Sequence, residues 1–157
     1  SDAGVLKRVD YSYLKGGDNT PSFYAYLASD QSLSSDTWTK LLIATESWDT
    51  DSAFASNKFT VPEGEDGKYV IGYSCGMNLL DDADRLFAKF YVNGGALSEW
   101  MSSDRSPSDN VDLFINFTGV IDLSAGDYVE LYGRQNTAGT LNMIADYTRL
   151  WGFKLIL

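Results

Sequence analysis

Three aspartates are the first residues whose types and spacing could do chemistry. Asp81, Asp82 and Asp84 place three carboxylates in one short segment, and hard cations such as Ca²⁺ prefer clusters of carboxylate oxygens. The spacing does not match an EF-hand loop. The sequence therefore offers calcium as the one candidate cofactor, with a solvated acidic turn as the alternative interpretation.

Two tryptophans form a second group, because each is surrounded by polar residues. Trp48 lies in SWDTDS beside Asp49 and Asp51, and Trp100 lies in EWMSSDRS shortly before Asp104. An exposed aromatic ring can stack on the face of a sugar while nearby carboxylates and hydroxyls bind the sugar's OH groups. We expect these five residues to bind a ligand from loops. The alternative is that both tryptophans fold back onto the edge of the domain.

Several kinds of catalysis are excluded by composition. The chain has no histidine, which removes the Ser-His-Asp triad, the Cys-His dyad, histidine zinc sites and imidazole acid–base catalysis. A glycosidase needs two carboxyl groups held about 5–9 Å apart in a cleft, and no pattern identifies such a pair. The single cysteine, Cys75, cannot form an intrachain disulfide and is expected to be a small buried apolar residue. We therefore expect a protein that is not an enzyme.

The charge and hydropathy patterns narrow the partners further. The formal net charge is −10, and binding to a phosphate backbone needs a basic stripe that this sequence lacks. No apolar stretch approaches the ~20 residues needed to span a bilayer, and no signal peptide is evident. We expect neither a nucleic-acid partner nor membrane insertion.

The elements that must position these residues are strands. The 10 Tyr, 8 Phe, 4 Trp and 14 Gly, with turn signals about every 8–12 residues, are typical of an all-β sandwich or barrel. Residues 1–20 carry no clear strand and are expected to form a lead-in segment, with a head domain at 21–157. The predicted strands are Phe23–Ala28, Lys40–Thr45, Ala53–Val61, Lys68–Cys75, Arg85–Val92, Ala96–Met101, Asp112–Val120, Tyr128–Gly133, Leu141–Ala145 and Tyr147–Leu157.

Two kinds of strand are visible in the hydropathy pattern. Arg85–Val92 and Tyr128–Tyr132 alternate apolar and polar residues, as expected of strands with one wet face. Lys68–Cys75, Asp112–Val120 and the final LWGFKLIL (Leu150–Leu157) are largely apolar on both faces. Because no helix is predicted that could cover a second face, we expect another copy of the chain to cover it. The alternative is cover by a long loop or by residues 1–20.

Several short motifs resemble the globular head of complement component 1q, a member of the tumour necrosis factor-like jelly rolls. Phe59–Ser74 (FTVPEGEDGKYVIGYS) resembles its phenylalanine–x–valine–proline segment and following strand, and Leu123–Leu131 (LSAGDYVEL) resembles its glycine–aspartate turn. The ending WGFKLIL is similar to its last strand, and SFYAYLAS and WTKLLIAT match its first strands. The resemblance covers about residues 22–157 in the right order.

The resemblance implies a ten-stranded jelly-roll β-sandwich that assembles as a homotrimer around a threefold axis. The inner sheet of the family packs on that axis, and its strands correspond to the three segments that fail to alternate. The residues expected at the trimer interface are Tyr69, Ile71, Tyr73, Phe114, Asn116, Trp151, Phe153 and Leu155.

These observations favour a non-enzymatic recognition head. The composition of the turns and the lack of cysteine pairs suggest a bacterial or bacteriophage source. We expect the receptor-binding tip of a virion fibre (phage tail or capsid) that binds a host-surface glycan or protein. An upstream stalk or other virion proteins would be partners, and the location would be the virion surface or extracellular. The alternatives are a structural decoration or connector protein of a virion without a receptor, and a carbohydrate-active enzyme on a jelly-roll fold.

Overall fold

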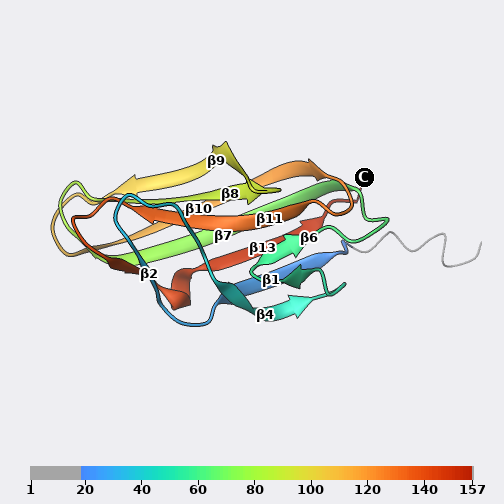
Figure 1. Ribbon diagram of the computed structural model, residues 1–157, viewed down its shortest axis with the longest axis horizontal. Helices are drawn as coiled ribbons and strands as arrows, with labels where there is room; N and C mark the ends of the chain where they lie inside the picture. The colour runs from blue at the N-terminus through green and yellow to red at the C-terminus, as the bar shows by residue number, and fades with distance from the viewer. Residues whose placement is uncertain (1–18, 157) are drawn as a thin grey trace, which may run out of the picture.

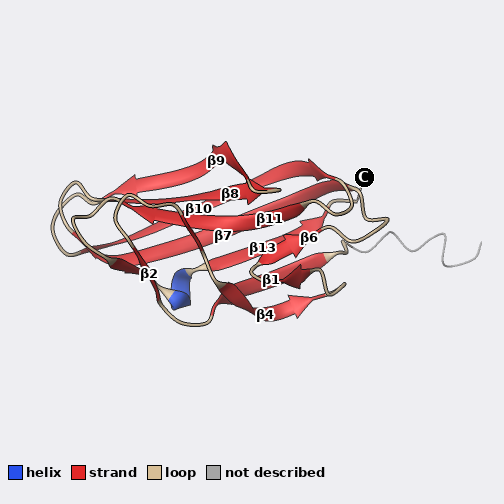
Figure 2. Ribbon diagram, in the orientation of Figure 1, coloured by secondary structure: helices blue, strands red, loops and turns tan. Residues whose placement is uncertain are grey.

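The computed structural model of the protein describes residues 19–156, and these form two β-sheets packed face to face (Figures 1 and 2). The seven-stranded sheet has the order β2-β12-β7-β13-β1-β4, with β10 paired to β7. Its strands are β1 (Ser22–Leu27), β2 (Gln31–Leu33), β4 (Ile43–Asp49), β7 (Gly67–Leu80), β10 (Val111–Leu123), β12 (Leu141–Met143) and β13 (Arg149–Lys154).

The six-stranded sheet has the order β5-β6-β11-β8-β9, with β3 paired to β11. Its strands are β3 (Thr39–Lys40), β5 (Phe54–Ala55), β6 (Lys58–Thr60), β8 (Arg85–Val92), β9 (Gly95–Arg105) and β11 (Tyr128–Gln135). A short 3₁₀ helix, Ala145–Tyr147, joins β12 to β13. The predicted all-β sandwich is confirmed for the described residues.

The longest strand, β7, organises the seven-stranded sheet. It pairs antiparallel with β10 on one side and with β13 on the other. Val70 lies opposite Val120 of β10 and Phe153 of β13, so the three side chains form a row across the sheet. This register fixes which side chains of the three strands share a face, because successive residues of a strand point to opposite faces.

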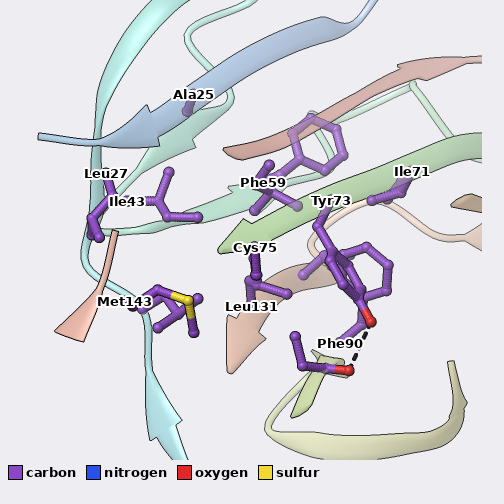
Figure 3. Packing of buried hydrophobic residues seen from close by; sticks show 14 of the residues in the cluster. Ala25, Leu27, Ile43, Phe59, Ile71, Tyr73, Cys75, Phe90, Leu131 and Met143 are labelled. Atoms are coloured by element: carbon purple, nitrogen blue, oxygen red, sulfur yellow. Dashed lines mark hydrogen bonds between the residues drawn. The ribbon is translucent and has the colours of Figure 1, made fainter. Parts of the chain in front are cut away.

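The core between the sheets is built on aromatic contacts. Phe23 of β1 lies between Phe54 and Phe59, with ring centroids 5.2 and 4.5 Å away. Tyr73 reaches across from β7, and its hydroxyl donates to the carbonyl oxygen of Ala88 at 2.7 Å. Figure 3 shows Tyr73 among the apolar side chains of both sheets. Each large apolar side chain buried here contributes about 1.5–3 kcal/mol.

Most predicted strands are present, but some boundaries differ. Residues 56 and 57 both adopt positive φ, 53° and 60°, and this turn splits the predicted strand Ala53–Val61 into β5 and β6. The predicted strand Lys40–Thr45 is likewise divided between β3 and β4, and β2 was not predicted. Within residues 19–156 the chain therefore forms strands β1–β13 instead of ten.

The turn between β8 and β9 has the conformation that its sequence predicts. Asn93 and Gly94 have φ of 51° and 77°, and a two-residue hairpin turn of this type requires positive φ at both positions. Asparagine and glycine adopt positive φ at the least steric cost. This turn therefore fixes the pairing of Val92 with Gly95 and of Tyr91 with Ala96, beyond which a bulge shifts the register between β8 and β9.

Candidate functional site

The side of the seven-stranded sheet that points away from the core is the candidate site, and we call it the outer face. It is occupied by alternate residues of five strands. In one cross-strand row, Trp48 lies opposite Tyr24, Tyr24 opposite Trp151, and Trp151 opposite Gly72. The side chains of the outer face include Tyr24, Tyr26, Trp48, Val70, Phe114, Val120, Trp151 and Phe153.

Stacked rings shape a shallow groove on the outer face. The rings of Tyr24 and Trp48 stack with centroids 4.9 Å apart, and Trp151 lies so close over Gly72 that a Cβ there would be 2.2 Å from the indole. A glycine at this position is therefore required by the close approach of the ring. The groove has a volume of about 460 Å³ and is lined by Asn19, Ser22, Phe23, Tyr24, Trp48, Trp151, Gly152 and Phe153.

Much of this apolar surface is open to solvent. Trp48, Phe114 and Val120 are 51%, 52% and 53% exposed. Tyr147 lies edge-on to Phe114, with ring centroids 4.7 Å apart, and is also exposed. Contiguous apolar patches on soluble proteins commonly mark interaction sites, whereas single exposed apolar residues need no explanation. The outer face thus has the composition of a contact surface.

The corresponding face of the six-stranded sheet differs, because charged groups cover its rings. The Lys89 ammonium lies 4.1 Å from the ring centroid of Trp38, and the Lys58 ammonium lies 4.1 Å from that of Tyr128. A cation over the face of an aromatic ring is attracted electrostatically and covers the ring with a polar group. This face already has its polar cover, so the outer face of the other sheet is the better candidate for contacting a partner.

Three of the predicted interface residues do not lie on the outer face. Tyr69, Ile71 and Tyr73 are at most 1% exposed and point into the core between the sheets. The prediction that they contact a sister chain is wrong, because the outward positions of this part of β7 are the residues between and beside them, such as Val70 and Gly72. Burial also raises the pKa of Tyr73 to about 12.

The other predicted interface residues lie where a partner could reach them. Phe114 and Asn116 are exposed on β10, and Trp151 and Phe153 are half-buried on β13. Leu155 is half-buried just beyond the end of β13. Their contact with another chain remains a prediction.

The predicted calcium site is not formed. The carboxylate of Asp84 accepts a hydrogen bond from the backbone N–H of Asp81 at 3.2 Å, which closes a turn. The carboxylate of Asp82 instead lies 3.9 Å from the guanidinium of Arg105. Between residues 19 and 156, no group of three or more His, Cys, Asp or Glu side chains is arranged to hold a metal ion. The acidic turn is thus a solvated turn.

The two tryptophans predicted to bind a ligand lie on strands of different sheets. Trp48 lies on β4 and is exposed. Trp100 lies on β9 and packs against Phe117 and Phe90, with ring centroids 5.3 and 5.8 Å away, so it covers the side of the sandwich. Asp104, also on β9, is exposed on the same strand as Trp100. The structure therefore does not bring the two tryptophans into one site.

The aspartates beside Trp48 have structural contacts. The Asp49 carboxylate accepts hydrogen bonds from the backbone N–H groups of Phe54 at 2.8 Å and Asp51 at 3.3 Å. Asp51 in turn accepts from the hydroxyl of Thr50. These bonds hold the turn between β4 and β5, and ligand binding by Asp49 and Asp51 remains a prediction.

Sequence reasoning missed the partners of Trp48 on the outer face. Tyr24 alternates with the buried residues Phe23 and Ala25, which is the signal that places Tyr24 on the opposite face. Val120 similarly alternates with the inward-pointing Ile121 in β10. Their pairing across strands could not be found from the sequence, because it depends on which strands are neighbours.

Comparison with known proteins reveals the fold. No family model and no curated protein matches the chain. The globular domain of zebrafish complement 1qA superposes with a TM-score of 0.61 at 16% identity, covering 86% of this chain and 97% of that one. Murine APRIL superposes with a TM-score of 0.62 at 15% identity, covering 85% and 98%. The TNF Eiger from S. frugiperda gives 0.57 at 17% identity, covering 85% and 90%. The chain therefore has a jelly-roll sandwich fold like that of complement 1q and tumour necrosis factor domains.

Proposed function

We propose that this chain is the subunit of a homotrimeric, non-enzymatic recognition head whose outer face packs against the other two copies. The observation that carries the proposal is the half-exposed apolar surface of Trp48, Phe114 and Val120 on one sheet. Domains of this fold commonly form homotrimers and are usually non-catalytic binding modules, which supports the same assignment.

The energy that this surface could supply is comparable with the free-energy cost of association. Covering on the order of 600 Å² of apolar surface per chain contributes about 15 kcal/mol at ~25 cal/mol per Å². The loss of translational and rotational freedom opposes association by about 4–15 kcal/mol. Contact with two neighbours is therefore favourable if most of the outer face is covered, whereas a small part of it would not be enough.

The two ends of the sandwich suggest where a ligand would bind. Ser22, at the start of β1, pairs with Phe153 near the end of β13, so both ends of the described chain lie at one end of the sandwich (Figure 1). The turns at the other end include those at residues 81–84, 106–110 and 136–140. We call these turns the distal loops. A stalk joined before residue 19 would leave the distal loops free to meet a receptor.

Hydrogen bonds join the distal loops into one surface. The N–H of Asp82 donates to the carboxylate of Asp109 at 3.0 Å, and the N–H of Ala83 donates to the carbonyl oxygen of Ser106 at 3.1 Å. The N–H of Arg85 donates to the side-chain oxygen of Asn136. A surface held in this way needs little ordering on binding, which favours affinity. We infer that it binds a host-surface glycan or protein, as the tip of a virion fibre.

A structural connector of a virion, without a receptor, is the second candidate. It is compatible with the position of the apolar groove, which lies on the outer face beside Trp48 and Trp151. If copies of the chain cover that face, the groove is filled by protein and is not free for a ligand. Receptor binding then depends on the distal loops alone.

Mass measurement in solution tests the trimer. Light scattering after gel filtration should give three times the chain mass for the unmodified protein. Val120→Glu should give monomers, because it places a charge on the outer face. Met101→Glu is the matched control, because Met101 is 41% exposed on a strand of the other sheet. A monomeric unmodified protein at tens of micromolar, or a trimeric V120E variant, would overturn the proposed assembly.

Binding measurement separates the two candidate functions. Ser108→Arg adds a bulky side chain to an exposed position of the distal loops, and Ala125→Arg adds the same group at the opposite end of the sandwich. A recognition head should bind cells or a glycan array, and Ser108→Arg should weaken that binding at least about tenfold while Ala125→Arg leaves it unchanged. A trimer that binds no cell or glycan in either form would favour the connector.

A further inference from the structure

Two turns at the end of the sandwich near the described chain ends are fastened together by one asparagine. The side-chain nitrogen of Asn93, in the turn between β8 and β9, donates to the carboxylate of Asp127 at 2.7 Å. The side-chain oxygen of Asn93 accepts from the N–H of Tyr128 at 3.0 Å. The N–H of Asn93 also donates to the carbonyl oxygen of Tyr128 at 3.0 Å. We call this set of hydrogen bonds the amide clasp.

The amide clasp requires a hydrogen-bond donor at position 93. The second carboxylate oxygen of Asp127 accepts from the N–H of Ser124 at 2.8 Å. This bond, together with the bond from Asn93, holds the pKa of Asp127 below its ordinary value. Asp127 is thus an anion at neutral pH, and an anion at position 93 would meet it at hydrogen-bonding distance.

The side-chain amide that supplies this donor, that of Asn93, is also in a sequence prone to deamidation. Asn93 is exposed and is followed by Gly94. Because glycine has no Cβ, its backbone nitrogen can approach the preceding side chain with little steric hindrance. We propose that Asn93 is a site of spontaneous deamidation, and that its conversion to aspartate or isoaspartate opens the amide clasp.

The reaction needs only water. The backbone nitrogen of Gly94 loses its proton and attacks the side-chain carbonyl carbon of Asn93, and the amide nitrogen leaves as ammonia. The five-membered imide that forms is then hydrolysed by water at either carbonyl, which gives aspartate or isoaspartate. No oxidation or reduction takes place, and no group other than ammonia leaves.

The product no longer fits the amide clasp. A carboxylate at position 93 has no N–H to donate and is repelled by the Asp127 carboxylate. Isoaspartate also adds one carbon to the main chain in a two-residue turn whose φ angles are 51° and 77°, and a turn of this type requires positive φ at both positions. In the folded chain the amide is held by its partners, so the reaction proceeds from an opened turn and its rate follows the population of that opened form.

Incubation of the full chain at mildly alkaline pH, followed by peptide mass spectrometry, tests the first part of the proposal. Asn93 should gain the mass of an amide-to-acid conversion faster than Asn110, which is also exposed and has positive φ but precedes Val111. Asp127→Ala removes the acceptor for the amide nitrogen and should speed the conversion of Asn93 at least about threefold, because the turn opens more often. Equal rates at the two asparagines, or no effect of Asp127→Ala, would overturn the deamidation site.

Exchanging the side chains of Asn93 and Asp127 tests the second part of the proposal, that an acid at position 93 opens the amide clasp. Asn93→Asp should lower the melting temperature at pH 8 by about 5 °C, as expected for the loss of a charged hydrogen bond in a chain of this size. The double variant Asn93→Asp/Asp127→Asn restores one donor and one anion at unchanged net charge, and it should recover most of that loss. A melting temperature unaffected by Asn93→Asp, or a double variant no better than the single one, would contradict the clasp. Both measurements use the isolated protein at one chain concentration and without a receptor, so their outcome does not depend on receptor binding.

Discussion

Replacing Tyr73 by phenylalanine removes a single oxygen atom that joins the two sheets. The hydroxyl donates to the carbonyl oxygen of Ala88 at 2.7 Å and accepts from the N–H of Ser102 at 2.9 Å. The hydroxyl of Ser102 lies at the same distance. Phenylalanine fills the same space in the core, so the change isolates the hydrogen bonds from the packing.

The magnitude follows from what the missing oxygen leaves behind. A buried polar group without its partner costs about 1–3 kcal/mol, and Ser102 is only half-buried, so water can partly replace the lost bond. We expect a loss of about 2 kcal/mol in the free energy of unfolding. This loss corresponds to a fall of roughly 4–8 °C in melting temperature for a domain of this size.

Calorimetry of Tyr73→Phe beside Tyr24→Phe measures the effect. Tyr24 lies on the outer face and stacks on Trp48, so loss of its hydroxyl should change the free energy of unfolding by less than about 0.5 kcal/mol. Because burial raises the pKa of Tyr73 to about 12, its hydroxyl stays protonated near neutrality and the difference should be constant from about pH 6 to about pH 9. If Tyr73→Phe instead dissociated an oligomer and left the melting temperature of the monomer unchanged, Tyr73 would face a partner and the reasoning would be refuted.

Three further predictions concern single positions. Gly72→Ala should displace the Trp151 ring, since a Cβ would lie 2.2 Å from it. The variant should have a lower melting temperature and a shifted tryptophan fluorescence spectrum. An unchanged emission spectrum would contradict the tight contact. The hydrogen bonds from the N–H of Ser124 and from Asn93 lower the pKa of the Asp127 carboxyl. The contribution of this carboxylate to the free energy of unfolding is therefore present above the unfolded-state pKa and is lost as the pH falls through the native pKa. Denaturant titrations should show a smaller decline in stability on acidification for Asp127→Asn than for the unmodified protein. Burial raises the pKa of the Cys75 thiol, and a thiol-reactive dye should label it only after unfolding, so that rapid labelling of the native protein would place Cys75 outside the core.

The sequence predicted the elements better than it predicted their faces. The strand Arg85–Val92 and the Asn93–Gly94 turn were predicted correctly, because alternation and turn chemistry are local properties. In β7, by contrast, Tyr69, Val70 and Ile71 are all apolar, so the hydropathy pattern does not indicate which of them face the core. The inward direction of Tyr69 and Ile71 is decided by the six-stranded sheet that packs on them.

The residues of the candidate site were partly predictable, because local hydropathy can be found in the sequence whereas contacts between distant residues cannot. Trp151 and Phe153 were expected at an interface because the last segment is apolar on both faces, and the structure places both on the outer face. The calcium site failed because the carboxylates of the acidic turn have separate partners, an N–H for Asp84 and a guanidinium for Asp82. The partner of Asp84 lies within the turn and that of Asp82 lies on β9, so the carboxylates do not converge on one point, and spacing along the chain does not reveal this.

By itself the sequence determined that this chain is a β-sandwich without histidine chemistry and with more apolar strand surface than one core needs. These properties follow from composition and from the two-residue period of a strand. Tertiary structure alone decided where this excess apolar surface lies. One continuous face is formed by three cross-strand pairs: Gly72 and Trp151, Tyr24 and Trp48, and Val120 and Val70. Neighbouring strands come from distant parts of the chain, so a surface of this kind exists only once the strands are paired.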